Sequence, residues 1–149
     1  MKKLIVALLI SFAGASAQAQ KYLPDSVDLR ASYCIAFFQD NTPPIEAFVL
    51  ENPSAKAHLS PVIEANKNNL TRLQNYLVPR LSFLETAALM SARNQFSSDQ
   101  KTVSACHARA CGANFQLKSP TECHAFCNKE TGGIGDKQDA CSNLTWIPF

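Results

Sequence analysis

The sequence predicts an all-α fold, a small helical domain of four to five helices with a disulfide-stapled C-terminal helical hairpin. Three observations favour this fold class. No stretch alternates apolar and polar residues convincingly with the period of two that a half-buried strand requires. Leucines recur every three or four residues along the middle of the chain, as in an amphipathic helix. Six cysteines, an even number, lie in a chain that begins like an exported protein, so disulfides are expected.

The first 19 residues have the three parts of a bacterial signal peptide. Lys2 and Lys3 form a basic start, an apolar run follows, and small residues precede possible cleavage sites near Ala17 or Ala19. The apolar run is shorter than the roughly 20 residues that a spanning helix needs, and no later stretch reaches that length. We therefore expect export to the bacterial periplasm or secretion. Residues 20–149 would form a single helical, disulfide-bonded domain without integral membrane association.

The charge balance argues against nucleic acid as a partner. The full chain has a formal net charge of +2, and Lys2 and Lys3 account for this excess. The remaining basic residues are scattered singly among acidic ones, whereas a nucleic-acid-binding protein shows a basic patch or stripe. A domain of about 130 residues buries roughly two thirds of its unfolded surface, so disulfides would supplement a hydrophobic core.

The first helical pieces are delimited by prolines. A helix is expected over residues 26–39, after Asp25. Its apolar face comprises Val27, Ala31, Cys34 and Phe38. Asn41-Thr-Pro-Pro44 is expected to end this helix, which leaves residues 41–59 as a long connection with a short apolar turn. Ser60-Pro61 then predicts a new helix, with serine as the cap and proline in the first turn.

A leucine stripe marks the middle of the chain. It comprises Leu70, Leu73, Leu77, Leu81, Leu84 and Ala88. Pro79 lies inside the stripe and predicts two helical segments that meet near Val78-Pro79, the second reaching about Gln95. We interpret the stripe as the core of the domain, with the seam of a coiled coil as the alternative.

Two further helices are expected to form the C-terminal hairpin. Ser97-Ser98-Asp99 is a cap signal for a helix that carries Cys106, and Gly112 is well placed to end it. Ser119-Pro-Thr-Glu122 is a capping box that opens a second helix, which should end before Thr131.

The remainder of the chain is expected to be a tail that returns to the helices. A glycine-rich loop leads into one helical turn around Cys141. Trp146, the single tryptophan, lies in an apolar end and is expected to dock this tail onto the core. An exposed recognition tail is the alternative.

The antiparallel geometry of the hairpin indicates how the cysteines pair. It favours Cys111–Cys123 as an inner bridge and Cys106–Cys127 as an outer one, which would leave Cys34 to pair with Cys141. The stretch over residues 106–127 resembles the α-hairpinin type of two-bridge helical hairpin, although that type has C-x3-C on both arms and this chain has C-x4-C on the first. The resemblance implies no activity. An alternative set joins Cys34 to Cys106 or Cys127 and leaves Cys141 as a hairpin partner.

The Cys-His dipeptides at Cys106-His107 and Cys123-His124 do not have the spacing of a metal site. Zinc sites commonly use C-x2-C and H-x3–5-H spacings, which are absent here. A histidine directly after a cysteine also points about 100° away from it on a helix. Exported cysteines favour disulfides. We therefore expect no metal and no cofactor, and we interpret the cysteines as structural.

The sequence contains no recognisable catalytic set. The G-x-S-x-G nucleophile motif is absent, and the glutamates are spread singly. Secreted phospholipases A2 use a helical His-Asp pair after a glycine-rich calcium loop, but here no aspartate follows His107 or His124 and the glycines come after the helix. We expect no catalytic residues and interpret the protein as a non-catalytic binding or interaction module, whose partner is expected to be another exported protein. The alternative is a small secreted hydrolase or lipid-active enzyme that uses His107 or His124.

Overall fold

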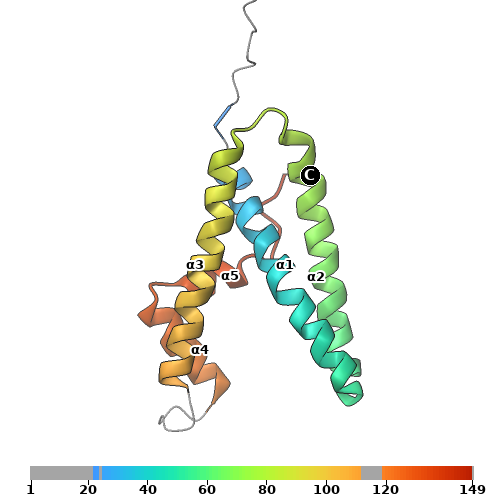
Figure 1. Cartoon of the computed structure of the whole chain (residues 1–149), viewed down its shortest axis with the longest axis vertical. Coiled ribbons are helices and arrows are strands. Elements are labelled where there is room, and N and C mark those ends of the chain that lie inside the picture. The colour runs from blue at the N-terminus through green and yellow to red at the C-terminus, as the bar shows by residue number, and fades with distance from the viewer. Residues whose placement is uncertain (1–21, 24, 112–118, 149) are drawn as a thin grey trace, which may run out of the picture.

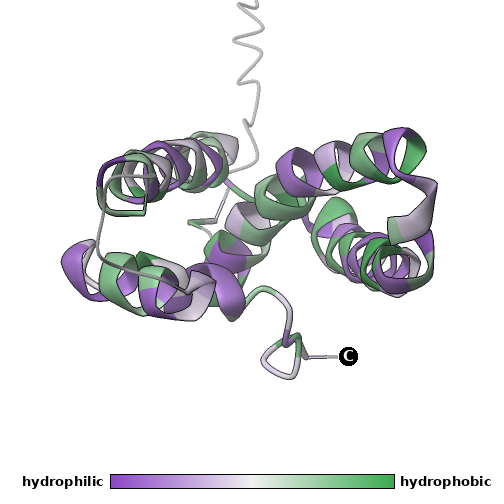
Figure 2. Ribbon diagram, turned by 90° about the horizontal axis from the view of Figure 1, so that it is seen from below, coloured by the Kyte–Doolittle hydropathy of each residue, from purple (hydrophilic) through white to green (hydrophobic). Residues whose placement is uncertain are grey.

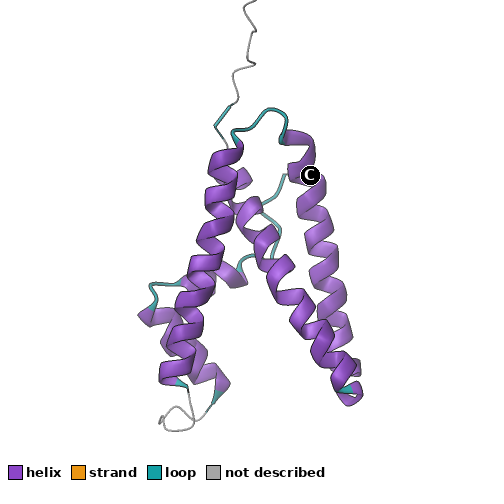
Figure 3. Ribbon diagram, viewed as in Figure 1, coloured by secondary structure: helices purple, strands orange, loops and turns teal. Residues whose placement is uncertain are grey.

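The computed structural model describes residues 22–23, 25–111 and 119–148, and these residues form an all-helical structure with five α-helices (Figure 3). The helices are α1 (Ser26–Glu51), α2 (Lys56–Leu77), α3 (Thr86–Ala110), α4 (Pro120–Glu130) and α5 (Ile134–Asp139). The predicted fold class is confirmed. The predicted signal peptide and the predicted helix stop at Gly112 lie outside the described residues.

Helix α1 lies between the two other long helices and contacts both of them (Figure 1). α2 runs antiparallel to α1, and α3 then runs back down the other side of α1. The short helices α4 and α5 pack against α3. The α1–α2 pair and the α3–α4 pair diverge towards one end, so the molecule has the outline of an inverted V (Figure 1).

The main core lies where α1, α2, α3 and the C-terminal tail meet. Three of the four residues on the predicted apolar face of α1, namely Ala31, Cys34 and Phe38, are 0% exposed. The other elements contribute Leu73, Leu77, Leu84, Leu89, Phe96, Cys141, Leu144 and Ile147. The leucine stripe therefore supplies the core, as predicted, although Leu81 is exposed. In Figure 2 polar and hydrophobic residues are mixed along each long helix, as expected of helices that pack along one face.

A second and much smaller core lies inside the hairpin of α3 and α4. It consists of Cys106, Ala110 and Cys127, with Cys111 packed against it. Because so little apolar surface is buried here, the hairpin depends on its two disulfides more than the main core depends on its one.

The helix break predicted at Asn41-Thr-Pro-Pro44 is wrong, since α1 continues to Glu51. The two prolines remove the amide hydrogens that would donate to the carbonyls of Gln39 and Asp40. Both of these residues are exposed, so solvent can replace the missing donors. Packing of the second half of α1 along α2 then stabilises the continuous helix. Most of the predicted connection over residues 41–59 is therefore helical.

The start predicted at Ser60-Pro61 is also wrong. α2 begins at Lys56, directly after a 3₁₀ turn over Pro53–Ala55, so Pro61 lies inside the helix. Pro61 is exposed, and the carbonyl that loses its donor lies in the first turns of the helix on an exposed residue. The tight turn after α1 sets the start of α2, and the serine cap is not used.

Pro79 divides the helices as predicted. α2 ends at Leu77, and a 3₁₀ turn follows over Val78–Arg80. The second segment does not resume at once, because the backbone of Tyr22 bonds to Phe83 and Glu85 on either side of Leu84, at 2.8 and 2.9 Å. This backbone pairing keeps residues 84–85 extended, and α3 begins directly after them.

α3 is continuous from Thr86 to Ala110, so the cap predicted at Ser97-Ser98-Asp99 is wrong. Asp99 is 5% exposed and points into the protein, where its carboxylate accepts hydrogen bonds from side chains of α1, α3 and α5. An inward-facing aspartate cannot cap backbone amides at the same time.

The predicted start and end of α4 are confirmed, and the tail differs in detail. The Ser119 hydroxyl accepts a hydrogen bond from the Glu122 amide at 3.1 Å, and α4 ends before Thr131. The helical turn predicted around Cys141 is instead α5, which ends before that cysteine. Trp146 is partly buried against the main core, and its Nε1 donates to the Ala140 carbonyl at 3.4 Å, so the predicted docking of the tail is confirmed.

Candidate functional site

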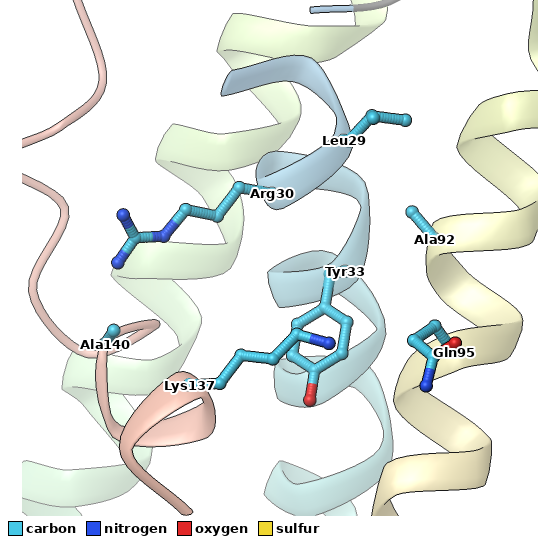
Figure 4. Close-up of a pocket in the computed structure, with 7 residues that line it drawn as sticks. All are labelled: Leu29, Arg30, Tyr33, Ala92, Gln95, Lys137 and Ala140. Atoms are coloured by element: carbon cyan, nitrogen blue, oxygen red, sulfur yellow. The ribbon is translucent and has the colours of Figure 1, made fainter. Parts of the chain in front are cut away.

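A cavity of about 320 Å³ opens between α1, α3 and the α5 segment (Figure 4). Its lining residues are Leu29, Arg30, Tyr33, Ala92, Gln95, Lys137 and Ala140. Leucine, alanine and the tyrosine ring make most of the wall apolar, and the charged groups come from Arg30 and Lys137. Pockets for small molecules combine an apolar wall with a few placed polar groups, and this volume lies at their lower limit.

The two cations at the cavity differ in what they contact. The Nζ of Lys137 lies 2.8 Å from a carboxylate oxygen of Asp99 and 4.0 Å from the ring centroid of Tyr33. Arg30 is exposed, and its guanidinium carbon lies 4.4 Å from the ring centroid of Trp146. Within the part of the chain that the structure describes, no carboxylate forms an ion pair with Arg30. Arg30 is therefore a cation at the cavity that has no acidic partner among the described residues.

Asp99 organises the polar side of the cavity. Its carboxylate accepts hydrogen bonds from the Tyr33 hydroxyl at 2.9 Å, from Gln95 Nε2 at 2.7 Å and from Lys137 Nζ at 2.8 Å. Burial by itself would raise the pKa of Asp99, but these hydrogen bonds, Lys137 first, lower it below its ordinary value. Burial and then the hydrogen bond to Asp99 raise the pKa of Tyr33 far above its ordinary value. At neutral pH Asp99 is thus ionised and Tyr33 is neutral.

Replacing Asp99 by asparagine should lower the free energy of unfolding at neutral pH by about 2 kcal/mol, because hydrogen bonds to charged groups are worth about 1.5–3 kcal/mol. The folded pKa of Asp99 lies below the unfolded value, so its contribution is complete above the unfolded pKa. It is lost as the pH falls through the folded pKa. The difference between the wild type and the variant should therefore shrink below about pH 4. Urea unfolding at a series of pH values measures this difference.

The matched control for this prediction is Asp40→Asn, since Asp40 is an exposed aspartate on α1. It should leave the stability unchanged within about 0.5 kcal/mol, as surface substitutions usually do. A loss in Asp99→Asn that stays constant into acid would mean that Asp99 acts through packing and not through its charge.

A second buried carboxylate, in the first turn of α1, links that helix to the end of α2 and the turn after it. Asp28 is 1% exposed and accepts two hydrogen bonds from Arg80, from Nε at 2.8 Å and from Nη2 at 3.2 Å. Tyr76 donates a third at 3.0 Å, and the Asp25 amide donates a fourth at 3.1 Å as part of the cap of α1. Burial alone would raise the pKa of Asp28, but these contacts lower it. Burial, followed by the hydrogen bond to Asp28, raises the pKa of Tyr76 to about 12.

The six cysteines form three disulfides. Cys34 pairs with Cys141, Cys106 with Cys127 and Cys111 with Cys123, with Cα–Cα distances of 5.3, 5.8 and 5.8 Å. These are the pairs that the antiparallel hairpin favoured, and the alternative that joins Cys34 to the hairpin is not the one formed. The Cys34–Cys141 bridge attaches the tail to α1. Because Cys141 follows α5 closely, the bridge also places the α5 segment beside the cavity.

The structure separates the three histidines. His58 is exposed on α2, and His124 lies on the surface of α4 with its Nε2 3.4 Å from an oxygen of Asp139. His107 lies in the hairpin, and its Nε2 is buried without a hydrogen-bond partner among the described residues. Neither His107 nor His124 lines the cavity between α1, α3 and α5.

Sequence reasoning missed the residues of the cavity. Arg30, Asp99 and Lys137 are single charged residues in helices, and nothing in their spacing distinguishes them from surface residues. The one signal was Asp99, a residue with cap chemistry whose side chain the structure uses for tertiary contacts instead.

Among the residues that the structure describes, no helix is long and apolar enough to cross a membrane. Comparisons of the chain with protein-family models, with curated proteins and with solved structures found no match.

Proposed function

We propose that the chain is an exported, non-catalytic binding protein that holds a small amphipathic anion in the cavity between α1, α3 and α5. The observation that carries this proposal is an apolar cavity with one unbalanced cation, Arg30, at its edge. Leu29, Ala92 and Ala140 would contact the hydrocarbon part of the ligand, and the guanidinium would bind a carboxylate through charge-assisted hydrogen bonds.

The polar groups of the cavity favour binding over acid–base catalysis. Asp99 is occupied by three donors, and its pKa is lowered, whereas the pKa of Tyr33 is raised. Both shifts move the pKa values of these groups further from neutral pH, whereas a general acid or base works best with a pKa near the working pH. Three disulfides support the exported location, because such bridges form and persist in oxidising compartments.

Octanoate should bind the purified chain more tightly than octanol, because only the carboxylate can pair with Arg30. Trp146 is the single tryptophan, and Arg30 lies over its ring, so its fluorescence reports on ligands that attract the guanidinium. The variant Arg30→Gln should lose roughly 10- to 100-fold in octanoate affinity and very little in octanol affinity, given about 1.5–3 kcal/mol for a charged hydrogen bond. Fluorescence titration measures the octanoate affinity, and calorimetry measures the affinities of both compounds.

Two further variants separate the cavity from general surface charge. Arg93 lies on another face of α3, where it contacts Gln39 of α1. Arg93→Gln should therefore leave octanoate affinity unchanged. Ala92→Phe should fill the cavity and abolish binding of both compounds while far-UV circular dichroism stays that of the wild type. Equal affinity for octanoate and octanol, or equal loss in Arg30→Gln and Arg93→Gln, would contradict the proposal.

A further inference from the structure

The hairpin contains a cluster of metal-ligating residues that the proposed ligand site does not use. His107, Cys123 and Cys127 each offer one ligand atom, and these three atoms lie within 4.8 Å of one another. Cys123 and Cys127 are buried. The Nε2 of His107 is also buried, and it lacks a hydrogen-bond partner among the described residues. A buried imidazole nitrogen without a partner is uncommon and needs an explanation.

A fourth ligand follows from the register of the two helices. Cys111 lies four residues after His107, and its amide donates to the His107 carbonyl at 2.8 Å, so the helical turn is complete and both side chains share one face of α3. Cys123 and Cys127 share one face of α4 in the same way. Cys111 is bonded to Cys123, so its sulfur is already at this cluster. Two i, i+4 pairs therefore face each other across the hairpin.

We propose that reduction of the two hairpin disulfides turns this cluster into a zinc site formed by His107, Cys111, Cys123 and Cys127. Three thiolates and one imidazole are a usual ligand set for tetrahedral zinc. With zinc–ligand distances of about 2.0–2.3 Å, the ligand atoms of such a site lie roughly 3.3–3.8 Å apart. The three atoms within 4.8 Å would therefore need to approach by about 1 Å.

The chemistry balances with a dithiol as the reductant. Each disulfide takes up two electrons and two protons and becomes two thiols, while the dithiol is oxidised to its own disulfide. Zinc then replaces the protons of three thiols, so its binding releases three protons to solvent, and the imidazole binds through a neutral nitrogen. In the oxidised chain the same sulfurs are bonded in pairs and cannot serve as thiolates.

Cys106 is the cysteine of the hairpin that the site leaves out. Its sulfur is bonded to Cys127 and so also lies beside the cluster, but Cys106 directly precedes His107 and leaves α3 about 100° around the axis from it. Its sulfur lies 3.4 Å from a carboxylate oxygen of Glu130. After reduction its thiol would donate to Glu130 and remain outside the site. The four hairpin cysteines are thus predicted to be unequal towards zinc.

The test is metal binding by the full chain after reduction with a phosphine, which does not itself supply a thiol. The reduced chain should bind one zinc ion and give a thiolate-to-metal charge-transfer band with cobalt, and zinc should raise its thermal midpoint. The oxidised chain should show none of these three responses. His107→Ala should weaken zinc binding by more than the roughly 10- to 100-fold that losing an outer partner of a ligand costs.

Matched variants identify the ligands. In the reduced state Cys111→Ser should lose the high-affinity site, whereas Cys106→Ser should keep it. His124→Ala, the histidine of the other Cys-His dipeptide, should bind zinc as the wild type does, because it lies on the surface of α4 beside Asp139. Equal zinc affinity in the oxidised chain, equal loss in Cys106→Ser and Cys111→Ser, or no effect of His107→Ala would overturn the proposal. None of these measurements depends on the ligand of the cavity.

Discussion

Replacing Cys34 and Cys141 together by alanine should lower the free energy of unfolding by about 4 to 5 kcal/mol, the largest single effect expected in this protein. The bridge joins residues 107 positions apart, and closing a loop of about 100 residues is worth roughly 4.7 kcal/mol in the chain-entropy model. The hairpin bridges span 21 and 12 positions, for which the same relation gives roughly 3 kcal/mol each.

Urea unfolding of the three double-alanine variants measures this ranking. All three remove two sulfurs from buried or half-buried positions, so each serves as a packing control for the others. Losing the Cys34 bridge should also release the tail, and octanoate binding should weaken with it, because Lys137 and Ala140 line the cavity. Equal losses of stability in the three variants would show that loop closure is not the main contribution.

Replacing Arg80 by methionine should lower the free energy of unfolding by about 3 kcal/mol, a loss as large as that expected for either hairpin bridge. Removing one partner of a buried ion pair costs about 3–5 kcal/mol, because the other charge is left buried without compensation. Asp28 is the buried partner, and Arg80 is partly exposed, so the lower end of that range applies. Chemical denaturation of the wild type and the variant measures the loss.

The acid response gives a second measurement on the same variant. In the wild type the pKa of Asp28 is lowered, so its contribution is complete above the unfolded pKa and is lost as the pH falls through the folded pKa. Without Arg80, burial should raise this pKa, and acid unfolding should begin at a higher pH.

Arg109→Met is the matched control for Arg80, because Arg109 pairs with Glu130 at the surface. Exposed ion pairs are typically worth about 0–1 kcal/mol, so this variant should lose no more than that. If both arginine variants lost the same small amount, the contact between Asp28 and Arg80 would be no stronger than a surface pair.

The features that the sequence predicted well depend on short-range geometry. Pro79 follows directly after the end of α2, Ser119 caps α4, and the hairpin cysteines pair as two antiparallel helices close in sequence would place them. In each case the responsible residues lie close together in the chain, so local rules determine the outcome.

The features that it predicted wrongly depend on contacts between distant segments. Pro43 and Pro44 are tolerated in α1 because their neighbours are exposed and α2 packs alongside. α3 continues through Asp99 because this side chain bonds to Tyr33 and Lys137 and does not cap a helix. These partners lie 66 and 38 positions away in the chain. The cavity combines two or three residues from each of three segments, and the residues from one segment form no motif by themselves.

The continuous α3 makes one helix a member of two cooperative units. Its first half, with Leu89 and Phe96, belongs to the main core, whereas its second half, with Cys106 and Ala110, rests on the small hairpin core. Regions with few buried apolar contacts open at a lower free energy than the whole protein. Amide protons of the second half should therefore exchange with solvent through local opening of the hairpin. Those of the first half should exchange only through global unfolding.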